Sequence, residues 1–466
     1  MILVTGVTGY VGGILWRELT RAGREVRGMT RKLSEADSRI VAADVLRPET
    51  LAPALEGVSV AYYLIHSMGA GRGFEELDRI AARNFGDAAM RAGVERIIYL
   101  GGLGESAEEL SPHLRSRQEA GEILRESGVK VIEFRASIVL GPGSLSFEMI
   151  RALVERLPVM VAPKWVSVPA QPIGIEDLVD YLVHAASMPL ERNHIFEIGG
   201  ADQVSYGGLM REYARQRGLR RWIIKAPVLT PYLSSLWLRL VTPLYAEVGR
   251  KLIDSIRHPT VVSDRAARFS FPIRPAGYRE AIAAALQMED EAFSTPGVGD
   301  PSAIRIRGSL GHGHYASRLI DMREVRVSAP AELAFRPILC IGGRTGWYYG
   351  NWMWRLRGWM DQMIGGPGMA RGRKHPDRIE RGDALDCWSV EQYDPPNRLY
   401  LRAEMKLPGR AWLEFLVMEE NGESVIRQTA IYDPRGLLGR AYWYLVYPLH
   451  GLVFAGMLAG IARAVR

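Results

Sequence analysis

Short apolar runs alternate with longer segments of helical periodicity over about the first 290 residues of the chain. The runs predict strands, and the segments between them, each with a glycine at or just past its end, predict helices. The predicted strands are Ile2–Thr5, Glu25–Thr30, Val58–Ile65, Arg96–Leu100 and Val129–Arg135, and the predicted helices are Gly13–Gly23, Phe74–Gly93 and Arg115–Gly128. Strand–helix–strand alternation requires crossovers, so we expect an α/β domain over residues 1–288 with a doubly wound parallel sheet. Its residues 151–288 should form a partly helical lobe beside the substrate.

The pattern changes after residue 288. Residues 289–322 are rich in Pro, Gly and charged residues in their first part, which is typical of a linker. Beyond the linker, a strand, a helix and an aromatic-rich segment precede four alternating strands separated by turn residues, and a long apolar helix follows. These predicted elements are the strand Arg323–Val327, the helix Ala329–Ile338, the strands Ala384–Gln392, Arg398–Met405, Ala411–Glu419 and Ser424–Tyr432, and the helix Ala441–Ala462. The order predicts a second, α+β domain over residues 323–466, built on an antiparallel sheet.

Composition excludes several classes of protein. Of the 466 residues, 47% are hydrophobic and 24% are charged, as in ordinary globular proteins and unlike disordered or collagen-like chains. Cys340 and Cys387 cannot form a framework of disulfides, so we expect a reducing, cytoplasmic location. The chain opens on a predicted strand without a basic leader, so we expect no signal peptide. The net charge of +7 is small and scattered, which disfavours nucleic acid and leaves anionic phosphates or a peripheral membrane contact open.

A glycine-rich turn directly follows the first predicted strand. The sequence Thr5-Gly6-Val7-Thr8-Gly9-Tyr10-Val11-Gly12 leads into the first predicted helix. Such glycines permit a tight turn, let backbone amides approach a pyrophosphate and let the helix pack closely on the sheet. The strand before and the helix after are the context that this motif needs. We therefore predict a dinucleotide site that includes Gly6, Thr8, Gly9, Tyr10, Val11 and Gly12.

The end of the second predicted strand indicates which dinucleotide is bound. NAD-binding folds place an Asp or Glu about 20 residues after the glycines, to hold the ribose 2′-hydroxyl. Here the chain has Arg31 and Lys32 and no carboxylate beside them. A 2′-phosphate needs positive charge, and a guanidinium can bind it with two hydrogen bonds. The sequence therefore favours NADP over NAD, with a solvated strand end as the alternative interpretation.

The spacing of the three glycines resembles that of the extended and atypical short-chain dehydrogenases/reductases, including NmrA-like proteins, over about residues 1–288. The resemblance implies a Rossmann-like fold. It also implies contacts with the adenine after the third strand and with the cofactor after the fourth. The residues at these positions are Asp44, Val45, Ile65, His66 and Ser67. Asp177, in a segment that matches the family's entry into a helix, is interpreted as a helix cap.

The catalytic set of that family is altered in this chain. The family uses a Tyr-x-x-x-Lys pair and a Ser at the end of the fifth strand, whereas here His113 and Arg117 occupy the pair and Gly101–Gly104 replace the Ser. His113 could act as the proton donor, because imidazole titrates near neutrality, while Arg117 keeps the cation for the ribose. Alternatively the site is degenerate and His113 is a surface residue at a helix start. Ser144 and Ser146 are further candidates for substrate contact.

Two apolar segments resemble membrane spans by hydropathy. The segment 226–246 contains three prolines, so a lid over the substrate or a buried helix pair is expected there. The segment 441–462 carries no formal charge and is long enough to span a bilayer. Pro448, His450 and several glycines dilute it, and we expect a buried helix in preference to a span.

The order of elements over about residues 323–466, with the segment Asp433–Tyr444, resembles START/polyketide-cyclase-like domains of the helix-grip fold. The resemblance implies that the last helix crosses a concave sheet and lines a cavity for lipids, polyketides or other apolar molecules. An aromatic cluster would suit such a cavity, although plain core packing is the alternative. Its members are Trp347, Tyr348, Tyr349, Trp352, Trp354 and Trp359.

Two functional hypotheses follow. The first is an NADPH-dependent oxidoreductase that acts on a small hydrophobic carbonyl or quinone-like molecule. The second is a non-catalytic NADP-binding regulator or scaffold with a lipid-binding module. No metal site is expected, and the sequence does not indicate an oligomeric state.

Overall fold

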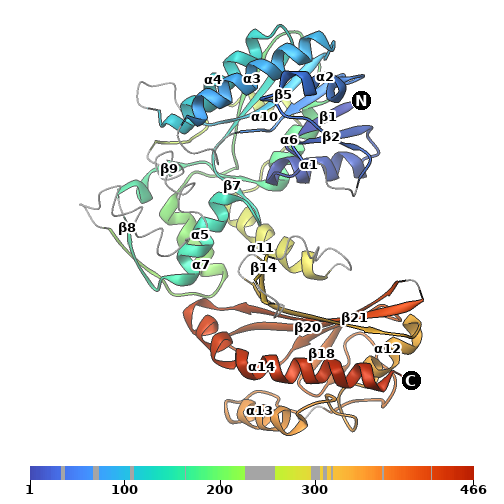
Figure 1. The fold of residues 1–466 in the computed structure, drawn as a ribbon. Helices are drawn as coiled ribbons and strands as arrows, with labels where there is room; N and C mark the ends of the chain where they lie inside the picture. The colour runs from blue at the N-terminus through green and yellow to red at the C-terminus, as the bar shows by residue number, and fades with distance from the viewer. Residues whose placement is uncertain are drawn as a thin grey trace. The chain divides into compact units, whose positions relative to one another are not determined.

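The computed structural model describes residues 1–32, 37–66, 73–104, 110–162, 164–225, 258–294, 305–307, 312–315, 318–369, 372–420 and 422–465. Two compact units make up the chain (Figure 1). The first comprises Met1–Val154 and Pro158–Gln287, and the second comprises Glu155–Leu157 and Met288–Arg466. Ser67 and the expected lid at 226–246 lie outside the described residues.

The first unit is built on a seven-stranded parallel sheet with the strand order β11-β6-β5-β4-β1-β2-β3. Its strands are β1 (Ile2–Thr5), β2 (Val26–Thr30), β3 (Ile40–Ala42), β4 (Val60–Tyr63), β5 (Arg96–Gly102), β6 (Lys130–Ala136) and β11 (His194–Ile198). The order reverses between β1 and β4, and doubly wound sheets bind ligands at the carboxyl ends of the strands at such a point. The predicted Rossmann-like, doubly wound fold is confirmed.

Helices cover both faces of this sheet (Figure 1). On one face α2 (Leu51–Leu55), α3 (Phe74–Arg91) and α4 (Pro112–Glu126) share a hydrophobic cluster with the strands. On the other, α1 (Tyr10–Arg21) contacts α6 (Ile175–Ala185). The alternation of side chains along β4 serves both layers: Tyr63 belongs to the first cluster, whereas the hydroxyl of Tyr62 donates to the Leu182 carbonyl of α6 at 2.8 Å.

The rest of the first unit consists of short strand pairs and helices, as the predicted partly helical lobe requires. These elements are β7 (Val139–Leu140), α5 (Leu145–Arg156), β8 (Val159–Ala162), β9 (Pro169–Ala170), β10 (Ile173–Gly174), β12 (Val204–Ser205), α7 (Tyr206–Gln216), β13 (Trp222–Lys225) and α10 (Ala266–Ser270). Asp177 does not cap its own helix, because Gly174 is the N-cap residue of α6. Its carboxylate instead accepts a hydrogen bond from the backbone N–H of Ala276 at 3.0 Å.

The second unit is built on an eight-stranded antiparallel sheet with the order β14-β15-β16-β21-β20-β19-β18-β17. Its strands are β14 (Arg305–Arg307), β15 (His312–Tyr315), β16 (Arg318–Val327), β17 (Ala384–Leu385), β18 (Trp388–Asp394), β19 (Arg398–Ala403), β20 (Gly409–Glu420) and β21 (Glu423–Pro434). The expected linker 289–322 therefore begins inside α11 (Tyr278–Ser294), ends inside β16, and contains two short strands, β14 and β15. They are too short to show alternation in the sequence, and they form by pairing beside β16.

The core of this unit lies between one face of the sheet and two helices, α12 (Ala331–Leu339) and α14 (Gly436–Ala464). A third helix, α13 (Asn351–Met363), contributes Trp354 to the core. A Cβ atom at Gly456 of α14 would lie 2.3 Å from the ring of Tyr349, and one at Gly460 would lie 2.7 Å from Cβ of Tyr348. The glycines that dilute the apolar helix thus allow these tyrosines to pack against it.

Among the described residues, one helix, α14, is long and apolar enough to cross a membrane, and 28% of its most apolar window is buried. One side of α14 packs into the core through Phe454, Met457 and Ile461. The other side exposes large apolar side chains, with Leu438 79% and Leu445 80% exposed. The helix is therefore buried along one side and not all round.

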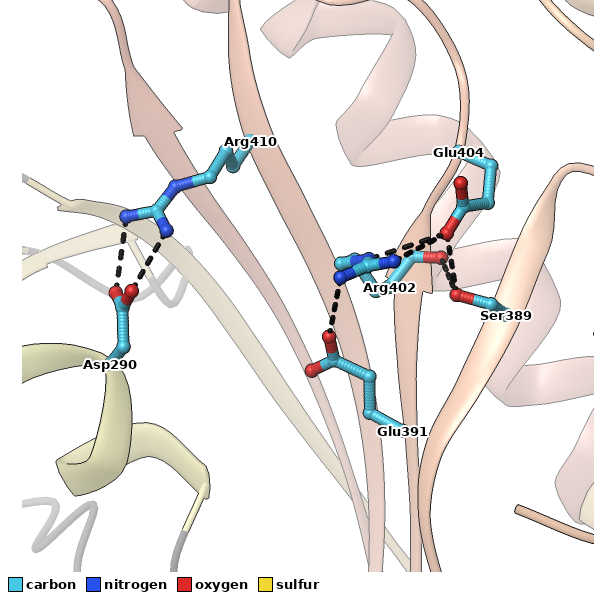
Figure 2. Close-up of polar contacts among 6 residues, drawn as sticks. All are labelled: Asp290, Ser389, Glu391, Arg402, Glu404 and Arg410. Atoms are coloured by element: carbon cyan, nitrogen blue, oxygen red, sulfur yellow. Dashed lines mark hydrogen bonds and ion pairs between the residues drawn. The ribbon is translucent and has the colours of Figure 1, made fainter. Parts of the chain in front are cut away.

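The opposite face of the sheet is rich in charged side chains that form ion pairs with one another. Figure 2 shows Arg402 of β19 between Glu391 and Glu404, at 3.3 and 2.9 Å. Arg410 of β20 binds both carboxylate oxygens of Asp290, in α11 (Tyr278–Ser294), at 2.8 and 3.1 Å. Because these charges already have partners, this face offers no open charged site among them.

Candidate functional site

A cavity of about 310 Å³ opens in the first unit at the carboxyl ends of β4, β5 and β6, beside the start of α1. Its wall comes from the glycine-rich turn, the start of α4, the loop around residues 137–146 and the segments around 168–170 and 258–260. The cavity lies at the reversal of strand order, where doubly wound folds bind their ligands.

The glycine-rich turn has no room for side chains. Gly6 has φ of +67°, which favours glycine, and a Cβ atom at Gly12 would lie 2.4 Å from the Gly6 carbonyl oxygen. Gly9 caps α1, so this helix begins three residues before the predicted start and inside the motif. The residues from Gly9 to Gly12 line the cavity. The positive end of the α1 dipole there is suited to a pyrophosphate.

Arg31 and Lys32 are exposed directly after β2. Neither lines the cavity. Asp37, the next described acidic residue, binds Arg39 through both carboxylate oxygens, at 2.9 and 2.6 Å. The hydrogen bonds from Arg39 lower the pKa of Asp37 to about 2. The described residues at this strand end therefore present two uncompensated cations and one carboxylate that is already bound.

The residues expected after the third and fourth strands divide into two groups. Asp44 accepts a hydrogen bond from the Leu46 amide at 3.0 Å, and the carbonyl of the buried Val45 accepts one from Asn84 at 2.9 Å. Both stabilise the turn after β3, and neither lines the cavity. His66, by contrast, lines the cavity, and Ile65 packs near Gly6.

His113 and Arg117 come together in the cavity wall, one turn apart on α4. Ser111 caps this helix by accepting a hydrogen bond from the Leu114 amide at 3.2 Å. The ring of His113 lies edge-on to that of His66, with 6.5 Å between centroids. The imidazole of His113 is therefore half-buried in the cavity wall beside a second histidine, and its role as a proton donor stays a prediction.

Arg117 is held rigidly. Its Nη2 donates to the Leu100 carbonyl at the end of β5, and its own carbonyl accepts from the Tyr99 hydroxyl at 2.7 Å. Its Nε is buried and has no acceptor among the described residues. Leaving a buried donor without an acceptor costs free energy. A ligand that offers an acceptor to Nε of Arg117 should therefore bind favourably in this cavity.

The missing serine has a spatial reason. A Cβ atom at Gly102 would lie 2.8 Å from the Leu114 side chain and 3.5 Å from Cδ of Arg117. The space of a serine side chain is therefore filled from α4.

The two candidate serines have structural partners. The hydroxyl of the buried Ser144 donates to the Val139 carbonyl at 2.6 Å, which fixes the loop. Ser146 lines the cavity, and its carbonyl accepts from the hydroxyl of Tyr206 at 3.4 Å. Sequence analysis missed Tyr206, His258 and Thr260, which also line the cavity. They come from distant segments and belong to no local motif, so no signal in the sequence marks them.

The second unit contains a cavity of its own, of about 270 Å³, between the core face of the sheet and helices α13 and α14. The expected aromatic cluster is divided around it. Trp352 and Trp354 line the cavity, whereas Trp347 is buried in the core and its indole N–H donates to Asp386 at 3.0 Å. Tyr348 and Tyr349 pack against α14, and Trp359 is exposed. Part of the cluster therefore packs in the core, and part lines a cavity whose use as a ligand site stays a prediction.

Two family models match parts of the chain. Residues 6–139 match a family described as NAD(P)H-binding. Residues 315–457 match a family of proteins of unknown function, DUF2867, which does not test the START-like resemblance.

Relatives and solved structures match the first unit. The chain is 24% identical over 235 residues to ceramide reductase of Caulobacter vibrioides, which spans 49% of this chain and 74% of that protein. It is 22% identical over 275 residues to the photosystem II assembly factor Ycf39 of Cyanophora paradoxa, over 56% of this chain and 81% of that protein. The triphenylmethane reductase of Citrobacter sp. has a similar fold, with a TM-score of 0.50 and 19% identity over 62% of this chain and 99% of that one. The first unit thus shares the Rossmann-like fold of these proteins, and its residues 6–139 match the NAD(P)H-binding family.

Proposed function

We propose that this protein is an NADPH-dependent oxidoreductase that reduces a hydrophobic carbonyl or quinone-like molecule, with His113 as the proton donor. The observation that carries the proposal is the meeting of His113 and Arg117 with the glycine-rich start of α1 in one cavity of about 310 Å³. The two side chains come from α4 and the glycine-rich turn from the start of α1, and together they would supply a proton source, a cation and a phosphate-binding helix end.

The residues fit a nicotinamide dinucleotide. The glycines keep the turn before α1 free of side chains, and Nε of Arg117 is a buried donor without an acceptor among the described residues. The start of α1 would hold the pyrophosphate, Arg31 and Lys32 would hold the 2′-phosphate, and Arg117 would orient the nicotinamide ribose. NADP is thus proposed over NAD, because two cations stand where a ribose-binding carboxylate would select NAD.

A bound NADPH would supply the hydride of the proposed reaction. His113 would donate the proton that the carbonyl oxygen of the substrate takes up, and it would regain a proton from water. The ring of His66 lies edge-on to that of His113 at 6.5 Å and would help to hold the substrate oxygen near it. Apolar residues such as Leu103 and Ile138 line the same cavity and would exclude water from the reacting atoms.

Oxidation of NADPH by the purified full-length chain, followed by absorbance with a panel of apolar aldehydes, ketones and quinones, tests the proposal. Because one relative is named ceramide reductase, the panel should include long-chain lipid carbonyls. Turnover that His113→Phe removes and Arg115→Gln preserves supports the proposal, because Arg115 is an exposed neighbour on the same helix. Turnover unchanged in His113→Phe would remove His113 from the mechanism.

A second candidate function is a non-catalytic NADP-binding regulator or scaffold. The filled space at Gly102 favours it, because the family's serine cannot be accommodated there without a shift of Leu114. One relative is named as an assembly factor and not as an enzyme, which also favours this candidate. This candidate predicts tight NADP binding and no turnover with any member of the carbonyl panel.

For the second unit we propose a START-like module that holds a small hydrophobic molecule in the cavity of about 270 Å³. The support is the position of this cavity, between a curved antiparallel sheet and a long C-terminal helix, as the helix-grip resemblance implies. Co-purified apolar molecules, detected by mass spectrometry of an organic extract, would support the module. A variant with Val446→Trp, which narrows the cavity, should lose them.

A cytoplasmic location with a peripheral membrane contact is proposed as well. Large apolar side chains are exposed on α13 and α14, among them Trp352, Met363 and Leu445, and Arg355 is exposed beside them on α13. Apolar side chains near cations favour the surface of an anionic bilayer. Flotation with anionic liposomes should recover the protein at low salt, and the double variant Trp352→Ser with Leu445→Ser should weaken recovery. Equal recovery of wild type and variant would refute this contact.

A further inference from the structure

The cavity of the second unit is walled by a continuous series of aromatic rings. Successive ring centroids are separated by 5.5, 5.1, 3.8 and 6.1 Å. The rings in order are Tyr432, Trp443, His450, Phe454 and Trp354. An apolar cavity of about 150 Å³ stays dry and binds benzene, so one of about 270 Å³ has room for a molecule of roughly two fused rings.

His450 is the third of these five rings, and the cavity is otherwise largely apolar, with Arg357 as the charged residue of its wall. Nδ1 of His450 is 3.1 Å from Oδ2 of Asp321, a carboxylate that is 1% exposed and is paired with Arg323 at 3.1 Å. Burial lowers the pKa of His450 below its ordinary value, despite the opposing effect of Asp321. The imidazole is therefore neutral at neutral pH. Because its Nδ1–H donates to Asp321, its Nε2 is left as a hydrogen-bond acceptor.

Three further polar groups in the wall have no hydrogen-bond partner among the described residues. They are the indole N–H groups of Trp354 and Trp388 and the hydroxyl of Tyr432. The three residues are 8%, 4% and 2% exposed. Buried polar groups in native proteins are almost always paired, so these three point to a ligand that pairs with at least one of them. The indole groups can only donate, whereas Nε2 of His450 can only accept.

We propose that this cavity binds an apolar alcohol or phenol whose hydroxyl donates a hydrogen bond to Nε2 of His450. A hydroxyl is both a donor and an acceptor, so it can satisfy His450 and also accept from a donor of the wall. A ketone or an ether offers His450 no donor. A carboxylate at His450 would face the lone pair of Nε2 with Asp321 directly behind it, so an acidic ligand would have to bind at Arg357 and not at His450. The inference rests on the proposal that the second unit holds an apolar ligand, and it is independent of the reaction in the first unit.

Calorimetric titration of the full-length chain in excess NADP, which occupies the nucleotide site, tests the inference with three probes of nearly equal shape. They are 2-naphthol, 2-methoxynaphthalene and naphthalene. We expect 2-naphthol to bind about threefold to tenfold more tightly than the ether, the range of one net hydrogen bond. The variant Val446→Trp should weaken all three, because Val446 lines this cavity.

Variants at His450 separate the hydroxyl contact from general packing. In His450→Gln the longer amide can place an acceptor at the position of Nε2, so this variant should keep the preference for naphthol. In His450→Asn the shorter amide reaches only the position of Nδ1, so this variant should lose the preference. Arg463→Gln, on the exposed side of the same helix, should bind all probes as the wild type does. Equal affinity of the wild type for naphthol and its ether would overturn the hydroxyl inference and leave the apolar-ligand proposal standing. Failure of every probe to bind, or binding that Val446→Trp does not weaken, would overturn both.

Discussion

Replacing Gly12 by alanine should destabilise the first unit and weaken NADP binding, although the same change in an ordinary helix would stabilise it. Gly12 lies in the first turn of α1, where alanine normally improves helix stability by up to about 1 kcal/mol over glycine. Here the new Cβ would lie 2.4 Å from the carbonyl oxygen and 2.9 Å from the carbonyl carbon of Gly6. Both atoms belong to the backbone, so no side-chain rotation can relieve the contact.

The size of the effect follows from that contact. To reach ordinary van der Waals distance, the turn and the start of α1 must separate by about 1 Å, and overpacking of this kind costs about 1–3 kcal/mol. The shift also moves the amides that would hold the pyrophosphate. Loss of one hydrogen bond to a charged group costs about 1.5–3 kcal/mol, which corresponds to roughly a tenfold to hundredfold weaker affinity for NADP.

Differential scanning calorimetry with and without NADP measures both effects, because a ligand that binds only the folded state raises the unfolding temperature of its own unit. Gly451→Ala in α14 is a matched control, since its Cβ would lie at an ordinary 3.6 Å from the Arg323 side chain. We expect the control to be neutral or stabilising. A Gly12→Ala variant that melts at or above the wild-type temperature and binds NADP within twofold would refute the assignment of this turn to the cofactor.

Three further predictions concern the cofactor, the proton donor and the last helix. Arg31→Ala should weaken NADP binding about tenfold to hundredfold and leave NAD binding nearly unchanged in calorimetry; equal affinity of the wild type for the two cofactors would contradict the assignment. His113→Phe should lower the rate of NADPH oxidation by ~10²–10⁴-fold at nearly unchanged NADP affinity, while His113→Tyr with Arg117→Lys should raise the pH optimum, because tyrosine titrates about three units higher than histidine. Gly456→Ala should destabilise the second unit by about 1–3 kcal/mol, because its Cβ would lie 2.3 Å from the ring of Tyr349; an unchanged melting temperature would show that this contact is absent.

The parts of the fold that local sequence determines were predictable. The strands β1, β5 and β6 and the start of the nucleotide site depend on apolar runs and on glycines within a few residues of one another. By contrast, β14 and β15 form only because β16 offers a partner, and three- or four-residue strands carry too few positions for a pattern. Strand pairing across a sheet is a long-range property that periodicity does not report.

The candidate site shows the same division. His113 and Arg117 could be identified because one helical turn separates them in the sequence and in space alike. His258 reaches the same cavity from a segment more than a hundred residues away, and nothing beside it in the sequence marks it. In the second unit, hydropathy could not distinguish a core helix from a span, because α14 packs one side and exposes the other.

The three departures from the family's catalytic set are spatially connected. The side chain of Leu114 occupies the volume that a side chain at position 102 would need, and Arg117, in van der Waals contact with that position, also holds the Leu100 carbonyl. A serine restored at Gly102 alone would therefore require the Leu114 side chain of α4 to shift, one residue after His113. The cation at Arg117, the filled space at Gly102 and His113 thus all lie on or against α4. His113 and His66, whose rings lie edge-on 6.5 Å apart in the cavity wall, are the imidazole pair that this arrangement provides, and His258 is a further imidazole in the same wall.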